Sequence, residues 1–319
     1  MTDPVSPTKI TVALSRCRKY NRQRLKHHIA ELVKACNFTA KSGTRLLLKP
    51  NLVAASCRQD LACTHPDFVA AVAEYFVDCG AKVKVGDSPA TGGGLRAMAI
   101  SGMTEALAYL PVELVEFART ETKVLPCGIK LQVAQEVLNC EALINLPKVK
   151  AHNQMRVTLA VKNYFGVVKG WRKVLAHQLH GANKGRRFLD LLVELPDILP
   201  TGITLMDGIS AMHGTGPMHG PKFNLALVAG SCDAQAVDTV LLEILGIKGA
   251  DSPLWQTAAN RKLPGTRPEL LNFPLACPDE LRVNNFQVPA VLVPVRFTLH
   301  HVMNSLVNRF KVFRRKLSG

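Results

Sequence analysis

The 319-residue sequence contains no run of about 18 consecutive apolar residues, so it offers no candidate for a membrane-spanning helix. Its first nine residues lack the basic start and apolar stretch of a secretory signal peptide. None of its nine cysteines falls in a Cys-x-x-Cys pair, and an odd count in a chain of this length favours reduced thiols over a disulfide framework. We therefore expect a cytoplasmic protein, either free or bound at the face of a membrane.

Aromatic residues make up only 6% of the chain, and no motif of a nucleic-acid-binding domain is present. Nucleic acid is therefore not favoured as a partner. The glycine-rich stretches lack the spacing of a Walker loop and of the dinucleotide-binding fingerprint. Hydrophobic residues, by contrast, account for 47% of the chain, which excludes a disordered or collagen-like polypeptide and provides for one large core or two smaller ones.

Positive charge is in excess, with 40 Lys and Arg residues against 24 Asp and Glu residues. Three segments that contain no acidic residue hold this excess, and the rest of the chain is mildly acidic. They are residues 16–28 with six basic residues, 148–187 with ten, and 296–319 with six. The basicity is thus local, and each segment needs its own explanation.

Short apolar runs alternate with helical patterns along most of the chain. The runs at 45–48, 82–85, 142–146, 203–206 and 225–229 are typical of strands, and the patterns at 25–36 and 64–79 are typical of helices. This alternation predicts an α/β fold in which a largely parallel sheet is flanked by helices.

We divide the chain into three parts. Residues 1–249 form the α/β core, residues 250–295 form an irregular appendage rich in proline, and residues 296–319 form a basic amphipathic helix. The apolar residues from Leu299 to Leu317 recur at helical spacing, with Lys and Arg between them. Such a helix can lie on an anionic membrane surface or an acidic protein partner, or it can pack its apolar stripe against the core.

Polar side chains follow five of the expected strands where each strand ends. Ligands of open α/β sheets bind beyond the carboxyl ends of the strands, where helix N-termini and loop amides converge. One polar residue at a strand end is ordinary, because strand ends are wet, but five such ends together favour a polar site. The residues are Lys49, Asn51, Asp87, Lys148, Lys150, His152, Asp207 and Asp233.

The same motifs, in the same order, resemble the domain of unknown function 362 family. The resemblance covers about residues 45–247. Members of that family are often fused to a ferredoxin-type iron–sulfur domain, and the resemblance implies no particular reaction. The residues that carry it are Lys49-Pro-Asn-Leu-Val53, Thr64-x-Pro66, Val85-Gly-Asp-Ser-Pro89, Ile144-Asn-Leu-Pro-Lys-Val-Lys-Ala-His152, Val161-Lys-Asn163, Phe165-Gly166, Asp207-Gly-Ile209, Gly216-Pro217 and Asp233-x4-Asp238.

The resemblance implies that Lys162, Asn163 and His177 belong to the same polar signature as the residues at the strand ends. Two departures matter. Ala151 stands where the family usually has Thr, which removes a hydroxyl near the expected site. The four-cysteine motif Cys-x2-Cys-x2-Cys-x3-Cys is absent, so an iron–sulfur cluster is not expected in this chain.

Carboxylates beside lysines and a histidine suit the binding of an anion and the movement of a proton. We predict four catalytic residues, His152, Lys150, Asp87 and Asp207. Asp207 and Asp233 are also candidate ligands of a divalent metal ion, although no His-x3-His or His-Glu-x-x-His spacing supports one. The predicted substrate-binding residues are Lys49, Asn51, Lys148, Lys162, Asn163, His177 and Gly216.

Two functions remain open at this point. The first is a cytoplasmic α/β enzyme that binds a small carboxylate or phosphate substrate and acts on it by Lys/His/Asp acid–base chemistry. The alternative is a non-catalytic redox or accessory protein whose basic faces recruit an acidic protein or an anionic membrane surface.

Overall fold

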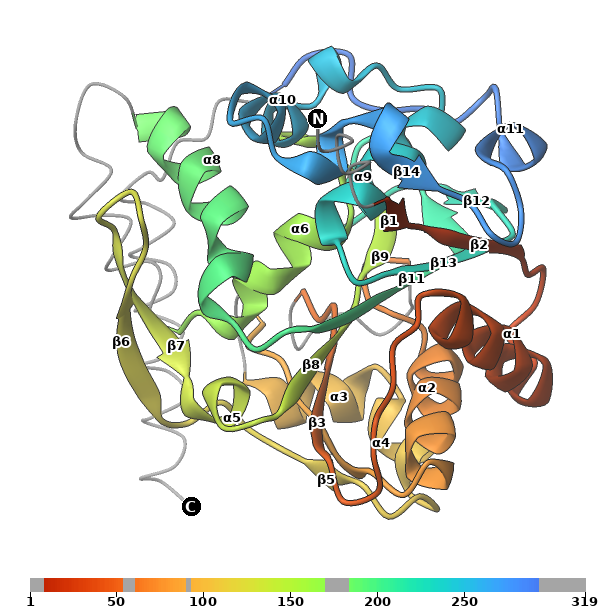
Figure 1. Cartoon of the computed structure of the whole chain (residues 1–319), viewed down its shortest axis with the longest axis vertical. Helices are drawn as coiled ribbons and strands as arrows, with labels where there is room; N and C mark the ends of the chain where they lie inside the picture. The colour runs from red at the N-terminus through yellow and green to blue at the C-terminus, as the bar shows by residue number, and fades with distance from the viewer. Residues whose placement is uncertain (1–8, 54–60, 90–92, 170–183, 293–319) are drawn as a thin grey trace, which may run out of the picture.

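The computed structural model describes residues 9–53, 61–89, 93–169 and 184–292 (Figure 1). A central sheet, composed of a parallel half and an antiparallel half, organises these residues. The parallel half runs through β5 (Glu113–Leu114), β4 (Lys82–Val85), β3 (Arg45–Pro50), β8 (Ala142–Leu146) and β11 (Gly202–Met212). The predicted α/β fold is thus confirmed.

The antiparallel half lies beyond β11. There β13 (Leu227–Ser231) pairs with β11 on one side and with β2 (Ala13–Arg16) on the other. The short strands β10 (Arg156–Thr158) and β12 (Lys222–Phe223) also pair in antiparallel fashion, with β9 (Lys148–His152) and β11 respectively.

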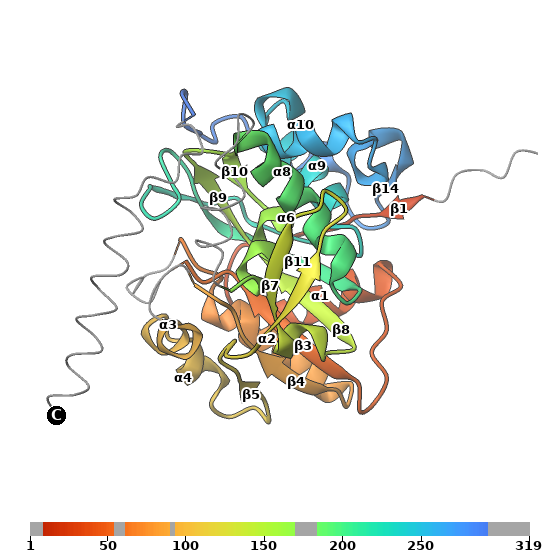
Figure 2. The same cartoon turned by 90° about the vertical axis from the view of Figure 1, so that its left-hand side faces the viewer.

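Helices cover both faces of the sheet (Figures 1 and 2). One face packs against α1 (Arg22–Ala35), α2 (Pro66–Asp78), α3 (Gly94–Ile100) and α4 (Met103–Leu107). The other face packs against α5 (Gln135–Leu138), α6 (Ala160–Asn163), α8 (Lys184–Glu194), α9 (Ala234–Ile244) and α10 (Pro253–Asn260).

The apolar run in β3 shows why this strand needs cover on both faces. Leu46 and Leu48 pack into the core on the α2 side, and Leu47 packs into the core on the α9 side. All three leucines are buried, which is the pattern expected where successive side chains point to opposite faces of a sheet covered by helices.

Residues 250–292 pack against the helices of the second face. Here α10 contacts α8 and α9, and α11 (Pro278–Leu281) contacts α9. The strand β14 (Leu271–Asn272) pairs with β1 (Ile10–Thr11), and a separate hairpin joins β6 (Thr120–Val124) to β7 (Lys130–Ala134). In the described ranges, no helix has the length and apolar character needed to cross a membrane. The expected helix over 296–319 lies outside these ranges.

The segment that follows β8 forms a further strand, which the sequence analysis did not predict. After Pro147, the chain continues as β9, which pairs with β11 and β10. Side chains alternate along a strand, so Lys148, Lys150 and His152 share one face of β9. Val149, on the opposite face, packs into the apolar core.

Candidate functional site

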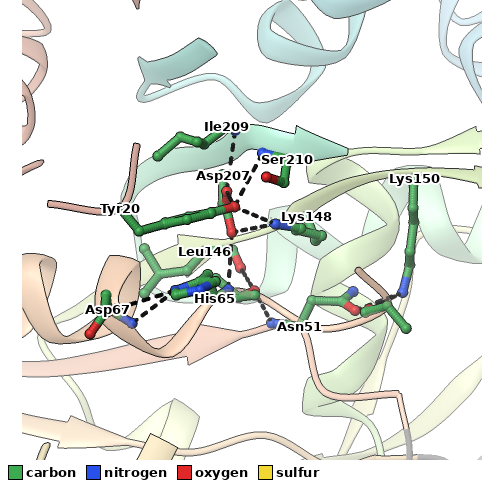
Figure 3. A network of polar contacts seen from close by, with 12 residues as sticks. Tyr20, Asn51, His65, Asp67, Leu146, Lys148, Lys150, Asp207, Ile209 and Ser210 are labelled. Atoms are coloured by element: carbon green, nitrogen blue, oxygen red, sulfur yellow. Dashed lines mark hydrogen bonds and ion pairs between the residues drawn. The ribbon is translucent and has the colours of Figure 1, made fainter. Parts of the chain in front are cut away.

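The first polar cluster of the site surrounds the ammonium group of Lys148 (Figure 3). Lys148 Nζ lies 2.8 Å from Asp207 Oδ2 and donates to the hydroxyl of Tyr20, also at 2.8 Å. The Tyr20 hydroxyl in turn donates to Asp207 Oδ1 at 2.8 Å. Burial lowers the pKa of Lys148, and the Asp207 carboxylate opposes that shift. Burial and Asp207 raise the pKa of Tyr20, so the phenol stays protonated.

The N-terminus of α2 completes this cluster. The backbone N–H of His65 donates to Asp207 Oδ2 at 3.0 Å, and the His65 ring stacks on Tyr20 with 3.6 Å between the ring centroids. His65 is also the N-cap of α2, because its Nδ1 accepts from the backbone N–H of Asp67. The Thr64 hydroxyl accepts from Asn51 N and donates to Leu146 O, which links β3 to β8.

A cavity of about 630 Å³ opens beside this first cluster. Its wall includes Tyr20, His65, Lys148 and Ser210. The first residues of α1 and α2 also line it, which brings the N-terminal ends of both helices to the same space. The N-terminus of a helix carries the positive end of the helix dipole, so this space suits an anion. The other lining residues are Arg22, Leu61, Pro66, Asp67, Ser101, Gly102, Glu105, Ala106, Tyr109 and Lys222.

A second polar network lies at the end of β3. Lys49 Nζ forms an ion pair with Asp87 Oδ1 at 2.7 Å, and both side chains are buried. Asp87 Oδ2 accepts from the backbone N–H of Leu52 at 2.8 Å, which fixes the loop after β3. Gly166 lies directly against this ion pair, and a Cβ atom there would overlap Asp87 Oδ1 and Lys49 Nζ.

Amide side chains extend the second network to β9. Asn51 Nδ2 donates to Asn163 Oδ1 at 2.9 Å, and Asn163 Nδ2 donates to Asn145 Oδ1 at 2.8 Å. Lys150 Nζ donates to Asn51 Oδ1 at 2.8 Å and to the carbonyl of Ala62 at 2.7 Å. Asn51 and Thr64 therefore connect the two clusters, because Thr64 accepts from the backbone of Asn51 and precedes His65.

His152 and Lys162 lie at the far end of the second network. Burial, Lys162 and Lys150 lower the pKa of His152 to about 2, so its ring is neutral at physiological pH. Its Nδ1 accepts from the backbone N–H of Gln154 at 3.0 Å, which leaves the proton on Nε2. The side chain is thus an N–H donor rather than an imidazolium acid. Burial and the charge of Lys49 lower the pKa of Lys162 to about 8.

The structure brings most of the predicted site residues into these two clusters. Gly216, which precedes a cis proline, packs against the backbone of Ala151 and His152. His177 lies outside the described ranges. The residues gathered are Lys49, Asn51, Asp87, Lys148, Lys150, His152, Lys162, Asn163 and Asp207.

Asp233 does not join them, so the structure does not bring together the two aspartates predicted as metal ligands, Asp207 and Asp233. The strand before Asp233 is antiparallel to β11, with Ser231 opposite Thr204 and Val228 opposite Asp207. Asp233 therefore lies toward the opposite end of the sheet, where it caps α9 by accepting from Ala236 N at 2.9 Å. Within the described part of the chain, no group of three His, Cys, Asp or Glu side chains is arranged to hold a metal ion.

Tyr20 and His65 are the residues that the sequence did not single out. Tyr20 falls in the basic segment 16–28, and His65 lies between the motif residues Thr64 and Pro66. Tyr20 precedes Asn21, the N-cap of α1, and His65 is the N-cap of α2. The signal that could have pointed to them is this placement, since loops at helix N-termini converge on the site of an α/β sheet.

Comparisons with known proteins agree with the motif order. A family model described as domain of unknown function (DUF362) matches residues 46–243. The chain is 34% identical over 307 residues to the "thylakoid-associated protein sll1697" of Synechocystis sp., and the match covers 95% of each chain.

Among solved structures, the chain is similar to the lactate racemase apoprotein from Thermoanaerobacterium thermosaccharolyticum, with a TM-score of 0.43 and 9% sequence identity. That match covers 72% of this chain and 55% of the racemase chain, so the chain spans little more than half of the racemase. Because the family model matches residues 46–243 and the Synechocystis relative is 34% identical, the chain belongs to the DUF362 family.

Proposed function

We propose that this protein is an enzyme that binds a small carboxylate or phosphate compound in the cavity beside Lys148 and acts on it by proton transfer. One observation carries the proposal: a cavity of about 630 Å³ whose wall combines Lys148 and Tyr20, both bonded to buried Asp207, with the N-termini of two helices. A cavity of this size is within the range of small-molecule sites.

The charges around the cavity favour an anion that carries a second polar group. Arg22, Lys148 and Lys222 supply positive charge, and the N-terminal ends of α1 and α2 add the positive ends of two helix dipoles. Asp67 and Glu105 also line the wall. These carboxylates favour a substrate with a hydroxyl or amino group in addition to its anionic group.

The proton chemistry rests on His65 and on the relay behind it. Burial lowers the pKa of His65, and its Nδ1 accepts from the Asp67 N–H, so the neutral ring carries its proton on Nε2. Tyr20 connects the Lys148 ammonium to the Asp207 carboxylate through two hydrogen bonds of 2.8 Å. We assign proton exchange with the substrate to His65 and to this relay.

The remaining predicted residues receive a supporting part in this proposal. The second network holds the loop after β3, through the Asp87 bond to Leu52 and the Lys150 bond to Ala62. This loop leads to Thr64 and His65, so the network positions the wall of the cavity. His152 acts as a neutral donor rather than as the acid or base expected from the sequence.

Calorimetric titration with inorganic phosphate and with malonate tests the proposal. We expect the wild-type protein to bind at least one of them, and Lys222→Met to weaken binding about tenfold, as expected for the loss of one charge at the site. Lys82→Met, which removes an exposed lysine of β4, is the matched control and should leave binding unchanged. Absence of binding, or equal binding by both variants, would overturn the proposal.

We also propose a second function, peripheral association with an anionic membrane through residues 296–319. Its support is the basic amphipathic pattern of that segment and the name of the Synechocystis relative, which is called thylakoid-associated. Co-sedimentation with phosphatidylserine-containing vesicles should fall steeply between low and high salt. It should be lost when Arg309, Lys311, Arg314, Arg315 and Lys316 are changed to Gln, and binding that survives these changes would reject the proposal.

A further inference from the structure

Ser210 of β11 joins the Lys148 cluster to the cavity (Figure 3). Its backbone N–H donates to the Tyr20 hydroxyl at 3.2 Å, and its own hydroxyl lies beside the same phenol. Ser210 lines the cavity with 8% of its surface exposed, against 1% for Lys148 and 0% for Asp207. Of these three residues, Ser210 is therefore the one that presents most surface to a ligand.

The phenol of Tyr20 has no hydrogen-bonding capacity left for a ligand. Its O–H donates to Asp207 Oδ1 at 2.8 Å. Its oxygen accepts from Lys148 Nζ at 2.8 Å and from the Ser210 N–H at 3.2 Å. A phenol has one donor and two lone pairs, so these three bonds use all of them. The Ser210 O–H is therefore not needed by Tyr20 and can turn to the cavity.

The strand β11 departs from regular geometry at Ser210. Residues two apart in a regular strand share a face, but Ile209 packs into the core on the α2 side and Ala211 into the core on the α9 side. The pairing of β11 with β9 also shifts register between Asp207 and Met212. This irregularity lets Ser210 reach Tyr20 from the same side as Asp207, although the two residues are three positions apart. Irregularities of this kind re-aim side chains and are over-represented next to active sites.

Positive charge surrounds the Ser210 hydroxyl at the cavity wall. Lys222 of β12 pairs with Met212, and Ser210 lies two residues before Met212 on the same strand. Because cross-strand partners and alternate residues share a face, Ser210 and Lys222 point to the same side, and both line the cavity. Lys148 also lines it. A hydroxyl beside two ammonium groups is well placed to donate to an anionic oxygen.

We propose that Ser210 contacts the substrate directly and that its hydroxyl donates to one anionic oxygen of the carboxylate or phosphate group. The inference rests on the proposed function and deepens it, because it names the group through which the Lys148 cluster touches the substrate. Lys148 and Asp207 fix Tyr20, and Tyr20 fixes the backbone of Ser210. The buried cluster thus sets the position of this hydroxyl, while Lys148 and Lys222 supply the charge.

Calorimetric titration with malonate and with inorganic phosphate tests the contact. Ser210→Ala removes the hydroxyl and keeps the backbone N–H that bonds to Tyr20. We expect this variant to bind about tenfold more weakly than the wild type, as for the loss of one hydrogen bond to a charged group. Ser101→Ala is the matched control. The Ser101 hydroxyl lines the same cavity but donates to the carbonyl of Met98, so this variant should bind as tightly as the wild type.

A second variant gives a readout that a merely structural role would not produce. Ser210→Cys places a thiol in the cavity wall, and iodoacetamide labelling of the full-length protein, followed by peptide mass spectrometry, measures its accessibility. Malonate at about ten times the Kd of this variant should slow labelling of the introduced thiol by about tenfold, because an occupied site is protected. Exposed Cys232 is the internal control in the same sample and should react at an unchanged rate.

The outcomes separate this inference from the proposed function. Ser210→Ala that binds as tightly as the wild type would overturn the inference and leave the proposed function standing. An introduced thiol that is not labelled, or that malonate does not protect, would do the same. Failure of the wild-type protein to bind either anion would instead overturn the proposed function, and the inference with it.

Discussion

Lys148 and Lys162 are both in the basic segment 148–187, but the fold treats them in opposite ways. Lys148 is buried against a carboxylate and a phenol, each 2.8 Å from its ammonium group. Lys162 has no such partner in the described part of the chain, and burial and the charge of Lys49 lower the pKa of its amine. The comparison teaches that one run of basic residues can contain both a charge held by buried partners and a charge that the described fold leaves without one.

The largest loss of stability should come from removing the counter-charge of Lys148. Asp207→Asn leaves Lys148 buried without a counter-charge, so we expect the free energy of unfolding to fall by about 3–5 kcal/mol. Urea denaturation measures this. Exposed Asp279→Asn is the control and should change stability by less than about 0.5 kcal/mol. A loss below about 1 kcal/mol in Asp207→Asn would show that the pair is not needed to hold Lys148.

Lys49 also forms a buried ion pair, and Gly166 packs directly against it. Gly166→Ala would place a methyl group onto the Lys49–Asp87 ion pair, and we expect a loss of about 2–3 kcal/mol. Gly185→Ala is the matched control, because its Cβ would meet no atom within 4 Å and it lies in α8. That control should stabilise the protein slightly. Equal effects of the two changes would mean that the ion pair can shift without cost.

Lowering the pH should destabilise the folded protein through His152. Its pKa is about 2 in the folded protein and about 6.5 when unfolded, so below pH 6.5 only the unfolded chain takes up this proton. The free energy of unfolding then falls as pH falls, by up to about 1.4 kcal/mol per pH unit from this group. His152→Gln should make the decline between pH 6.5 and 5 shallower in urea denaturation. An unchanged slope would contradict the assignment.

The smallest change in stability should come from removing the amine of Lys162. Lys162→Met deletes a charge that has no partner to orphan, so we expect stability to stay the same or to rise by up to about 1 kcal/mol. Lys148→Met, measured alongside, should destabilise because it leaves Asp207 buried without its cation. If both variants lose the same stability, the difference between the two lysines that we infer is absent.

Much of the fold could be predicted from apolar runs. The strands over 82–85 and 142–146 were predicted with their observed bounds, because strands covered on both faces have few polar positions. The hairpin of β6 and β7 was missed, since exposed polar residues dominate β6. The antiparallel direction of β13 could not be predicted from the sequence either. It follows from pairing with β2, an N-terminal strand far away in sequence.

The sequence predicted which residues belong to the candidate site better than it predicted how they are arranged. Lys148, Lys150 and His152 were placed at a strand end, but their spacing of two residues is also that of one face of a strand, which β9 adopts. Tyr20 and Asp207 are 187 positions apart and meet only through the tertiary fold. No local pattern in the sequence specifies such a contact.

The most direct test of the account is a crystal structure of the full-length protein grown with malonate at a concentration that saturates calorimetric binding. We predict one malonate in the cavity beside Lys148, within hydrogen-bond distance of Lys222 and Arg22. An empty cavity under these conditions, or malonate bound at Lys162 instead, would contradict the central claim.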